Sequence, residues 1–264
     1  MLRTRLLTAA VALPALWLII WKLWDPVFNA FIFAVAAIGL HEFFAMASPD
    51  DGVERAAGIG FGLAVAAGVV TGTLAGAAIA LTVVAGFVFP LVRHHDLPRA
   101  VSRLGILLLG VLYVGFLIPH VCLLRAQPDG WRWVIFTVAG AMGSDTGGYF
   151  AGRAFGRHKL LPAVSPGKTV EGSVGGLLGA VLGALVIRFI LLPARGAGEV
   201  VALGLAIGVL AQLGDLAESA LKRAFGAKDS GWIIPGHGGI LDRLDSLLFP
   251  FVLTYYYLAV LPRG

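Results

Sequence analysis

Charged residues are scarce in this chain. Asp, Glu, Lys and Arg make up 13% of its 264 residues, whereas 58% are hydrophobic. Soluble domains average about a quarter charged residues, so this composition excludes a soluble globular protein and predicts an integral membrane protein. Cysteine is scarcer still: Cys122 is the only one, which excludes a disulfide within the chain. The net charge of +5 fits a surface of anionic lipid headgroups, and we expect no nucleic-acid partner.

Long apolar stretches make up most of the sequence. A helix needs roughly 20 apolar residues to cross a membrane, and nine stretches qualify: about 6–24, 27–47, 56–73, 75–92, 102–122, 131–151, 173–192, 199–219 and 246–262. We interpret the first as a transmembrane helix rather than a signal peptide, because its apolar run is too long and further spans follow. The prediction is an all-α, polytopic membrane protein of about nine transmembrane helices, forming a single membrane domain over residues 1–264.

Basic residues in the connections indicate the orientation. With nine spans, the N-terminus and the loops 48–55, 93–101, 152–172 and 220–245 lie on one side, and that side holds 14 of the 20 Lys and Arg residues. Positive connections stay in the cytoplasm, so the N-terminus is expected there. The two most polar loops, 152–172 and 220–245, then face the same compartment, as one shared site requires.

Glycines recur at intervals of four residues, as in Gly175, Gly179 and Gly183. Such spacing lets helix backbones approach closely in lipid. We expect packing within the chain, and a homodimer face is the alternative.

One polar stripe ends the eighth span. Asp215, Glu218, Ser219 and Lys222 occupy relative positions 0, 3, 4 and 7, which lie on one face of a helix. Acids at the end of an apolar span need a cation, and Lys222 offers one. A structural ladder of ion pairs is the alternative to a functional site.

A second polar cluster precedes the ninth span. Asp242, Asp245 and Ser246 share a helical face and follow the turn Gly236-His237-Gly238-Gly239, whose glycines allow close approach of a ligand to the backbone. Two acidic clusters with Lys222, Lys228 and Arg243 nearby fit metal-assisted phosphoryl transfer, since Mg²⁺ takes one or two carboxylates plus phosphate oxygens.

A third cluster surrounds the loop after the sixth span. Asp145 lies within an apolar stretch, where an acid needs a partner. The basic residues Arg153, Arg157, Lys159 and Lys168 follow and suit phosphate groups, although such loops are often topology signals. Glu42, near the end of the second span, is a weaker signal, for which we expect a structural role.

These motifs resemble those of phosphatidate cytidylyltransferases (CDP-diacylglycerol synthases). The run from Ser219 to Asp245 matches the family pattern Ser-x-x-Lys-Arg, Lys-Asp, Pro-x-His-Gly-Gly and Asp-Arg-x-Asp, and the segment 144–172 matches a second block. Gly167 stands where a lysine or arginine is common in that block. The close match covers about residues 140–250, so we expect residues 126–264 to carry the site and residues 1–125 to be weakly matched N-terminal helices.

The resemblance implies a reaction, partners and a location. The reaction is CTP + phosphatidic acid → CDP-diacylglycerol + pyrophosphate, with Mg²⁺ and a potassium ion compatible with it, at a bacterial-type inner membrane with the active site facing the cytoplasm. By the same resemblance the metal ligands are Asp215 and Asp242. Residues expected to bind substrate are Lys168, Ser219, Gly238 and Gly239. Residues expected to be catalytic are Asp145, Lys222, Arg223, Lys228, Asp229, His237, Arg243 and Asp245.

Two rival functions stay open. A CTP-dependent polyprenol or phytol kinase would transfer phosphate to a lipid alcohol and release CDP rather than pyrophosphate. An ion-coupled transporter would use Asp145 and Asp215 as an ion path, but the polar residues cluster on one side and no pair of broken helices is visible.

Overall fold

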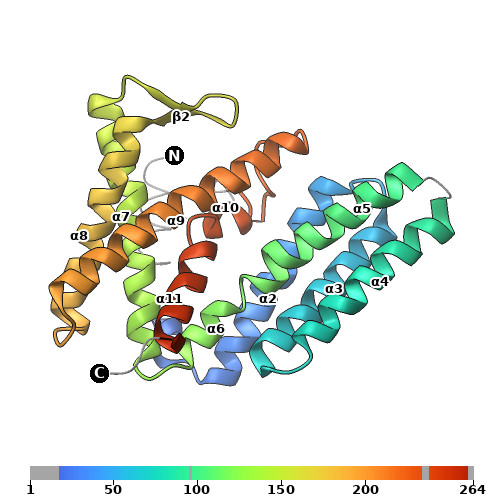
Figure 1. The fold of residues 1–264 in the computed structure, drawn as a ribbon, viewed down its shortest axis with the longest axis horizontal. Helices are drawn as coiled ribbons and strands as arrows, with labels where there is room; N and C mark the ends of the chain where they lie inside the picture. Colours follow the sequence, from blue (N-terminus) through green and yellow to red (C-terminus); the bar gives the residue numbers. More distant parts are fainter. Residues whose placement is uncertain (1–17, 95–96, 234–237, 261–264) are drawn as a thin grey trace.

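The chain folds into helices that run between two opposite ends of the molecule (Figure 1). The computed structural model describes residues 18–94, 97–233 and 238–260. The helices are α2 Asp25–Ala47, α3 Gly52–Thr71, α4 Ala75–His94, α5 Leu97–Gly110, the π-helix η1 Val111–Phe116, α6 His120–Arg125, α7 Gly130–Phe155, α8 Val170–Leu191, α9 Ala197–Ala224, α10 Leu241–Leu244 and α11 Leu248–Val260. Helices α7, α8 and α9 form one group, α2 to α5 form a second, and α6, α10 and α11 lie between them.

Local signals in the sequence explain several helix ends. Asp51 caps α3 by accepting hydrogen bonds from the N–H groups of Val53 and Glu54. The same helix stops at Gly72, whose φ of +68° favours glycine. Thr169 caps α8 through the N–H of Gly172 at 3.1 Å.

Helices occupy the expected spans from residue 27 onward, while most of the first, 6–24, lies outside the described residues. Five segments are long and apolar enough to cross a membrane: Asp25–Ala47, Gly52–Thr71, Ala100–Arg125, Val170–Leu191 and Ala197–Ala224. Residues 75–88 and 248–260 form shorter apolar helices. The fold is therefore that of a helical membrane protein, and the count of nine spans and the orientation of the N-terminus stay predictions.

A short antiparallel hairpin departs from the all-α prediction. Strand β1 (Lys159–Leu161) pairs with β2 (Ser165–Thr169), with Lys159 opposite Thr169 and Leu161 opposite Ser165. Pro162 and Pro166 lack the N–H that a helix interior needs, which explains why this polar loop does not extend α7 or α8.

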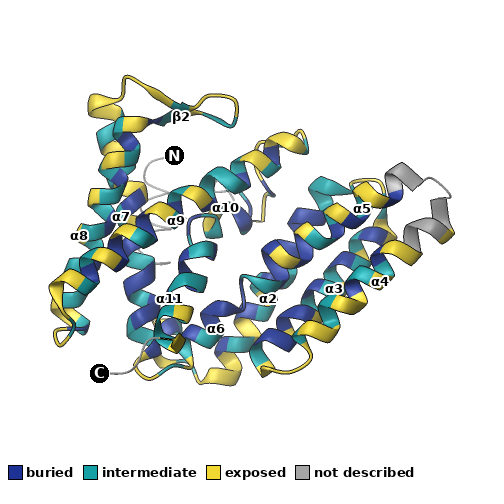
Figure 2. Cartoon of the chain, viewed as in Figure 1, coloured by how far each residue is buried: buried dark blue, intermediate teal, exposed yellow. Residues whose placement is uncertain are grey.

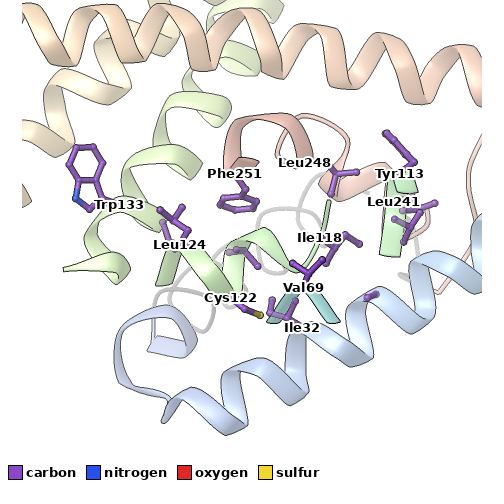
Figure 3. Close-up of a cluster of buried hydrophobic side chains, with 14 of the residues drawn as sticks. Ile32, Val69, Tyr113, Ile118, Cys122, Leu124, Trp133, Leu241, Leu248 and Phe251 are labelled. Atoms are coloured by element: carbon purple, nitrogen blue, oxygen red, sulfur yellow. The ribbon is translucent and has the colours of Figure 1, made fainter. Parts of the chain in front are cut away.

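The apolar side chains divide between a core and an outer surface (Figure 2). Figure 3 shows part of the core, where Leu241, Leu248 and Phe251 lie among side chains from the N-terminal half and from α7. On the outside, α8 exposes Leu178, Leu182 and Phe189, the last at 81% of its surface. Apolar exposure on this scale is unfavourable in water and suits a helix that faces lipid.

Close backbone contact joins α7 to α8. A Cβ added at Gly179 would strike the backbone of Gly143, and one at Gly147 would strike that of Gly175. The row Gly175, Gly179 and Gly183 therefore packs within the chain, as expected, and joins the two helices that flank the candidate site.

Candidate active site

A cavity of about 440 Å³ opens between α7, the start of α8, α9 and the hairpin. Its polar lining comes from elements far apart in sequence: Ser144, Asp145, Tyr149, Arg153, Lys168, Thr169, Ser173, Gln212 and Asp215. Gly148, Gly152 and Gly172 also line it, and a Cβ added at any of them would lie against the facing backbone of α7 or α8 or against Thr169. The cavity therefore brings the third predicted cluster against the first.

Lys168 and Asp215 form an ion pair in this cavity. The Lys168 Nζ lies 2.6 Å from Asp215 Oδ2, joining the end of β2 to α9. Ser219 Oγ lies 3.4 Å from Asp215 Oδ1, one turn further along α9. Asp145, on α7, accepts a hydrogen bond of 3.1 Å from Ser246 Oγ, which ties the cavity wall to the segment before α11. Two carboxylates and an ammonium group thus line one space.

Asp242 is held at a second position, next to Lys222. Its Oδ1 lies 2.5 Å from Lys222 Nζ, and its Oδ2 accepts hydrogen bonds of 2.9 Å from Ser230 N, Ser230 Oγ and Gly239 N. Burial raises the pKa of this carboxyl, but the hydrogen bonds from Lys222 and from the two N–H groups outweigh burial and lower the pKa to about 2. Asp242 is therefore ionised at neutral pH.

Glycine is required beside Asp242. Gly238 has a φ of +79°, and a Cβ there would lie 2.7 Å from Asp242 Oδ2. A side chain at this position would both strain the backbone and displace the carboxylate.

Further acids lie between these two positions. Glu218, 1% exposed, is 3.2 Å from Lys222 Nζ, so Lys222 bridges Glu218 and Asp242. Burial and the charge of Asp215 raise the pKa of Asp245. The backbone of Asp245 packs directly on Gly214 of α9. The stripe predicted on α9 therefore faces the second predicted cluster.

Of the remaining predicted catalytic residues, the four that the structure describes do not line this cavity. Arg223, Lys228 and Asp229 are exposed at and after the end of α9, where Arg223 Nη1 donates to the Ala227 carbonyl at 3.1 Å. Arg243 is exposed on α10. His237 lies outside the described residues. The location of these residues does not test the catalytic roles expected for them, so these roles stay predictions.

The two predicted metal ligands belong to different hydrogen-bonded groups. Asp215 lines the cavity with Lys168, whereas Asp242 is surrounded by Lys222, Ser230 and Gly239. Within the described parts of the chain, no three His, Cys, Asp or Glu side chains are arranged to hold a metal ion. The donor chemistry still fits Mg²⁺, which is bound by one or two carboxylates and completes its shell with water and phosphate oxygens.

The sequence reasoning missed one pair of residues, Ser173 and Gln212, and the partners of Glu42. Ser173 Oγ bonds to Gln212 Oε1, and Gln212 Nε2 donates to the Ser173 carbonyl at 3.0 Å, inside the cavity. Their polarity within apolar spans was an available signal. Glu42 contacts Ser230 and the backbone of residues 240–241, a contact across almost 200 residues that no local pattern signals.

The architecture and this polar site define a class of helical membrane protein with a carboxylate-rich cavity at one end. The sequence model of the cytidylyltransferase family matches residues 3–261, and the chain belongs to that family. It is 44% identical over 152 residues to the phosphatidate cytidylyltransferase of Brucella suis, covering 57% of this chain and 56% of that protein. It is 42% identical over 142 residues to the phosphatidate cytidylyltransferase of Staphylococcus epidermidis, covering 54% of each. The matched segment spans about half the length of these curated relatives.

Proposed function

We propose that this protein transfers CMP from CTP to phosphatidic acid, giving CDP-diacylglycerol and pyrophosphate. The cavity carries the proposal: Lys168, Asp145 and Asp215 line a space of about 440 Å³ beside the lipid-facing helix α8. A nucleotide and a membrane lipid could meet there. The names of the two relatives support the choice of substrates.

In this proposal a phosphate oxygen of phosphatidic acid attacks the α-phosphorus of CTP. The bond from that phosphorus to the oxygen bridging to the β-phosphorus breaks, and pyrophosphate leaves with the electron pair. The attacking oxygen is already anionic near neutral pH, so little general-base help is needed. Catalysis depends on orientation and on neutralising charge, which the Lys168 ammonium supplies at the cavity wall.

Mg²⁺ and its ligands remain part of the proposal. When bound, Mg²⁺ would neutralise phosphate charge and orient the reacting oxygens. Asp215 and Asp242 are the proposed ligands, and K⁺ is a second proposed ion. Asp145 shares the cavity with Asp215 and would orient the bound groups. Lys222, which bridges Glu218 and Asp242, would fix the second carboxylate.

We also propose nine spans, a cytoplasmic N-terminus and a site that faces the cytoplasm at a bacterial-type inner membrane. The hairpin and the C-terminal ends of α2 and α9 point to one end of the molecule, while the α3–α4 and α8–α9 connections lie at the other (Figure 1). This arrangement supports one compartment for the polar loops. A homodimer is not required by the site.

Two isotopic positions in CTP test the reaction. Purified protein in detergent is incubated with phosphatidic acid, Mg²⁺ and CTP labelled at either the α- or the γ-phosphorus. We expect the α-label in the lipid phase and the γ-label in pyrophosphate. Transfer of the γ-label to lipid would instead indicate a lipid kinase, and no transfer of either label would refute both activities. Asp215→Asn is the inactive control, and Asp50→Asn, an exposed acid in the turn after α2, is its matched active control.

A further inference from the structure

A carboxylate from the N-terminal half of the chain reaches the second acidic cluster. Glu42, near the end of α2, is 3% exposed. Its Oε1 accepts a hydrogen bond of 2.9 Å from Ile240 N, and its Oε2 accepts bonds of 3.0 Å from Leu241 N and 3.1 Å from Ser230 Oγ. The Ile240 and Leu241 N–H groups belong to the segment 238–242, which carries Asp242, and the Ser230 hydroxyl also lies 2.9 Å from Asp242 Oδ2.

The backbone at Gly231 and at Gly239 lies close to the Glu42 carboxylate. A Cβ added at Gly231 would lie 2.7 Å from Glu42 Oε1, and one added at Gly239 would lie 2.5 Å from Oε2. Only residues without side chains allow this approach. The burial of a carboxylate among aligned N–H donors costs much less than its burial without partners, so the contact depends on the segment keeping this conformation.

Three consecutive N–H groups of this segment bond to the two carboxylates, one to Asp242 and two to Glu42. Gly239 N donates to Asp242 Oδ2, while the next two N–H groups, of Ile240 and Leu241, donate to Glu42. The Ser230 hydroxyl lies between the carboxylates, 3.1 Å from Glu42 Oε2 and 2.9 Å from Asp242 Oδ2. Displacement of Glu42 would therefore displace the groups that hold Asp242.

We propose that Glu42 is a positioning residue for Asp242. It fixes the segment 238–242 against α2 and so sets where the Asp242 carboxylate stands relative to Lys222. The assignment rests on the proposed function only in so far as Asp242 serves the transfer of CMP. It gives the N-terminal helices a part in the active site that their weak match to the family motifs does not indicate.

The substitution Glu42→Gln isolates this contact. Glutamine keeps the shape but replaces one acceptor oxygen with an NH₂ donor. If the NH₂ group faces Ile240 N, the hydrogen bond from Ile240 is lost. If it faces Leu241 N and Ser230 Oγ, at least the hydrogen bond from Leu241 is lost, and two N–H donors then face each other. Glu54→Gln is the matched control, because Glu54 is also buried, at 9% exposure, and pairs with Arg103 on the separate helix α5.

Hydrogen–deuterium exchange of the detergent-solubilised protein tests the contact without reference to activity. In Glu42→Gln we expect amides of residues 238–245 to exchange about tenfold faster or more, since a buried donor left unpaired favours opening. Glu54→Gln should leave this segment at the wild-type rate. Wild-type exchange in Glu42→Gln would overturn the proposal, as would equal acceleration in both variants.

Turnover and its Mg²⁺ dependence test the positioning role. Loss of groups that support a metal ligand lowers affinity or activity by about 10- to 100-fold. We expect such a fall in kcat/KM for Glu42→Gln, with a higher half-saturating Mg²⁺ concentration, and values within about twofold of wild type for Glu54→Gln. Unchanged turnover in Glu42→Gln with accelerated exchange would show a structural contact only and would overturn the positioning role.

A second variant covers the case in which Glu42→Gln does not fold. Gly231→Ala disturbs the same contact from the loop side and should accelerate exchange in residues 238–245 in the same way. If exchange stays at the wild-type rate in this variant, the proposal fails. If the wild-type protein makes no CDP-diacylglycerol, the proposed function fails, whereas the exchange result still decides whether Glu42 holds the Asp242 segment.

Discussion

The contact between α7 and α8 should be intolerant of a single methyl group. In Gly179→Ala, the new Cβ would meet the Gly143 carbonyl oxygen well inside the 3.4 Å at which ordinary contacts begin. It would also lie 3.0 Å from Gly143 C and 3.1 Å from Gly147 Cα. All three atoms are backbone, so no side-chain rotation relieves the clash, and the helices must move apart.

The expected cost follows from overpacking. Forcing an extra carbon into a close-packed contact costs about 1–3 kcal/mol. Gly60→Ala is the matched control, since Gly60 lies inside α3 with no atom within 4 Å of an added Cβ, and it should gain up to about 1 kcal/mol of helix propensity. Gly179 also lies inside a helix, α8, so Gly179→Ala gains the same propensity, and the two variants should differ by roughly 1–3 kcal/mol in free energy of unfolding.

Thermal unfolding in detergent measures this difference. About 2–4 °C in Tm corresponds to each kcal/mol for a chain of roughly this size, so Gly179→Ala should melt several degrees below Gly60→Ala. Turnover well below Tm should also fall, because separation of α7 and α8 moves Asp145 away from Lys168 across the cavity. A Gly179→Ala protein as stable as the Gly60→Ala protein would refute the close contact.

Three further outcomes are expected at the site. Asp215→Asn and Asp242→Asn should each abolish turnover while the protein stays folded and membrane-inserted; wild-type rates in either purified variant would contradict its assignment as a metal ligand. Lys168→Met, which removes the cation 2.6 Å from Asp215, should lower kcat/KM at least tenfold, as loss of one charge-stabilising group commonly does, and a change within twofold would argue against its role. Chelation of Mg²⁺ should stop the reaction and its re-addition should restore it, as followed by release of pyrophosphate.

Periodicity predicted the helices and one side of the site well. The apolar stretches coincide with α2 to α9 and α11 because a membrane-spanning helix must be apolar over most of its length. The spacing of Asp215, Glu218 and Lys222 placed these residues on one face of α9, and Glu218 and Lys222 do lie 3.2 Å apart. Contacts between residues three to seven positions apart on one helix are set by the helical repeat, so the sequence alone predicts them.

Relations between distant segments could not be predicted in this way. The pairing of Lys168 with Asp215 depends on how the hairpin folds over the C-terminal half of α9, and the contact of Glu42 with residues 240–241 depends on the packing of α2 beside α10. Because two side chains on different helices share no sequence period, their meeting is set by tertiary packing alone. The contact agrees with the structural role expected for Glu42, and the positioning role proposed above goes beyond that expectation.

The arrangement of charge explains why a metal ion should be needed at all. Lys168 and Lys222 form ion pairs with Asp215, Glu218 and Asp242, and Asp145 and Asp245 add further carboxylates to the same region. The proposed substrates, CTP and phosphatidic acid, both carry phosphate charge, which ionised carboxylates at this site would repel. A divalent cation reverses the balance, since it is attracted by the carboxylates and in turn attracts the phosphates. Under the proposed function the acids would make binding of the nucleotide depend on the cation, so CTP should bind measurably tighter with Mg²⁺ than without it even when no lipid is present.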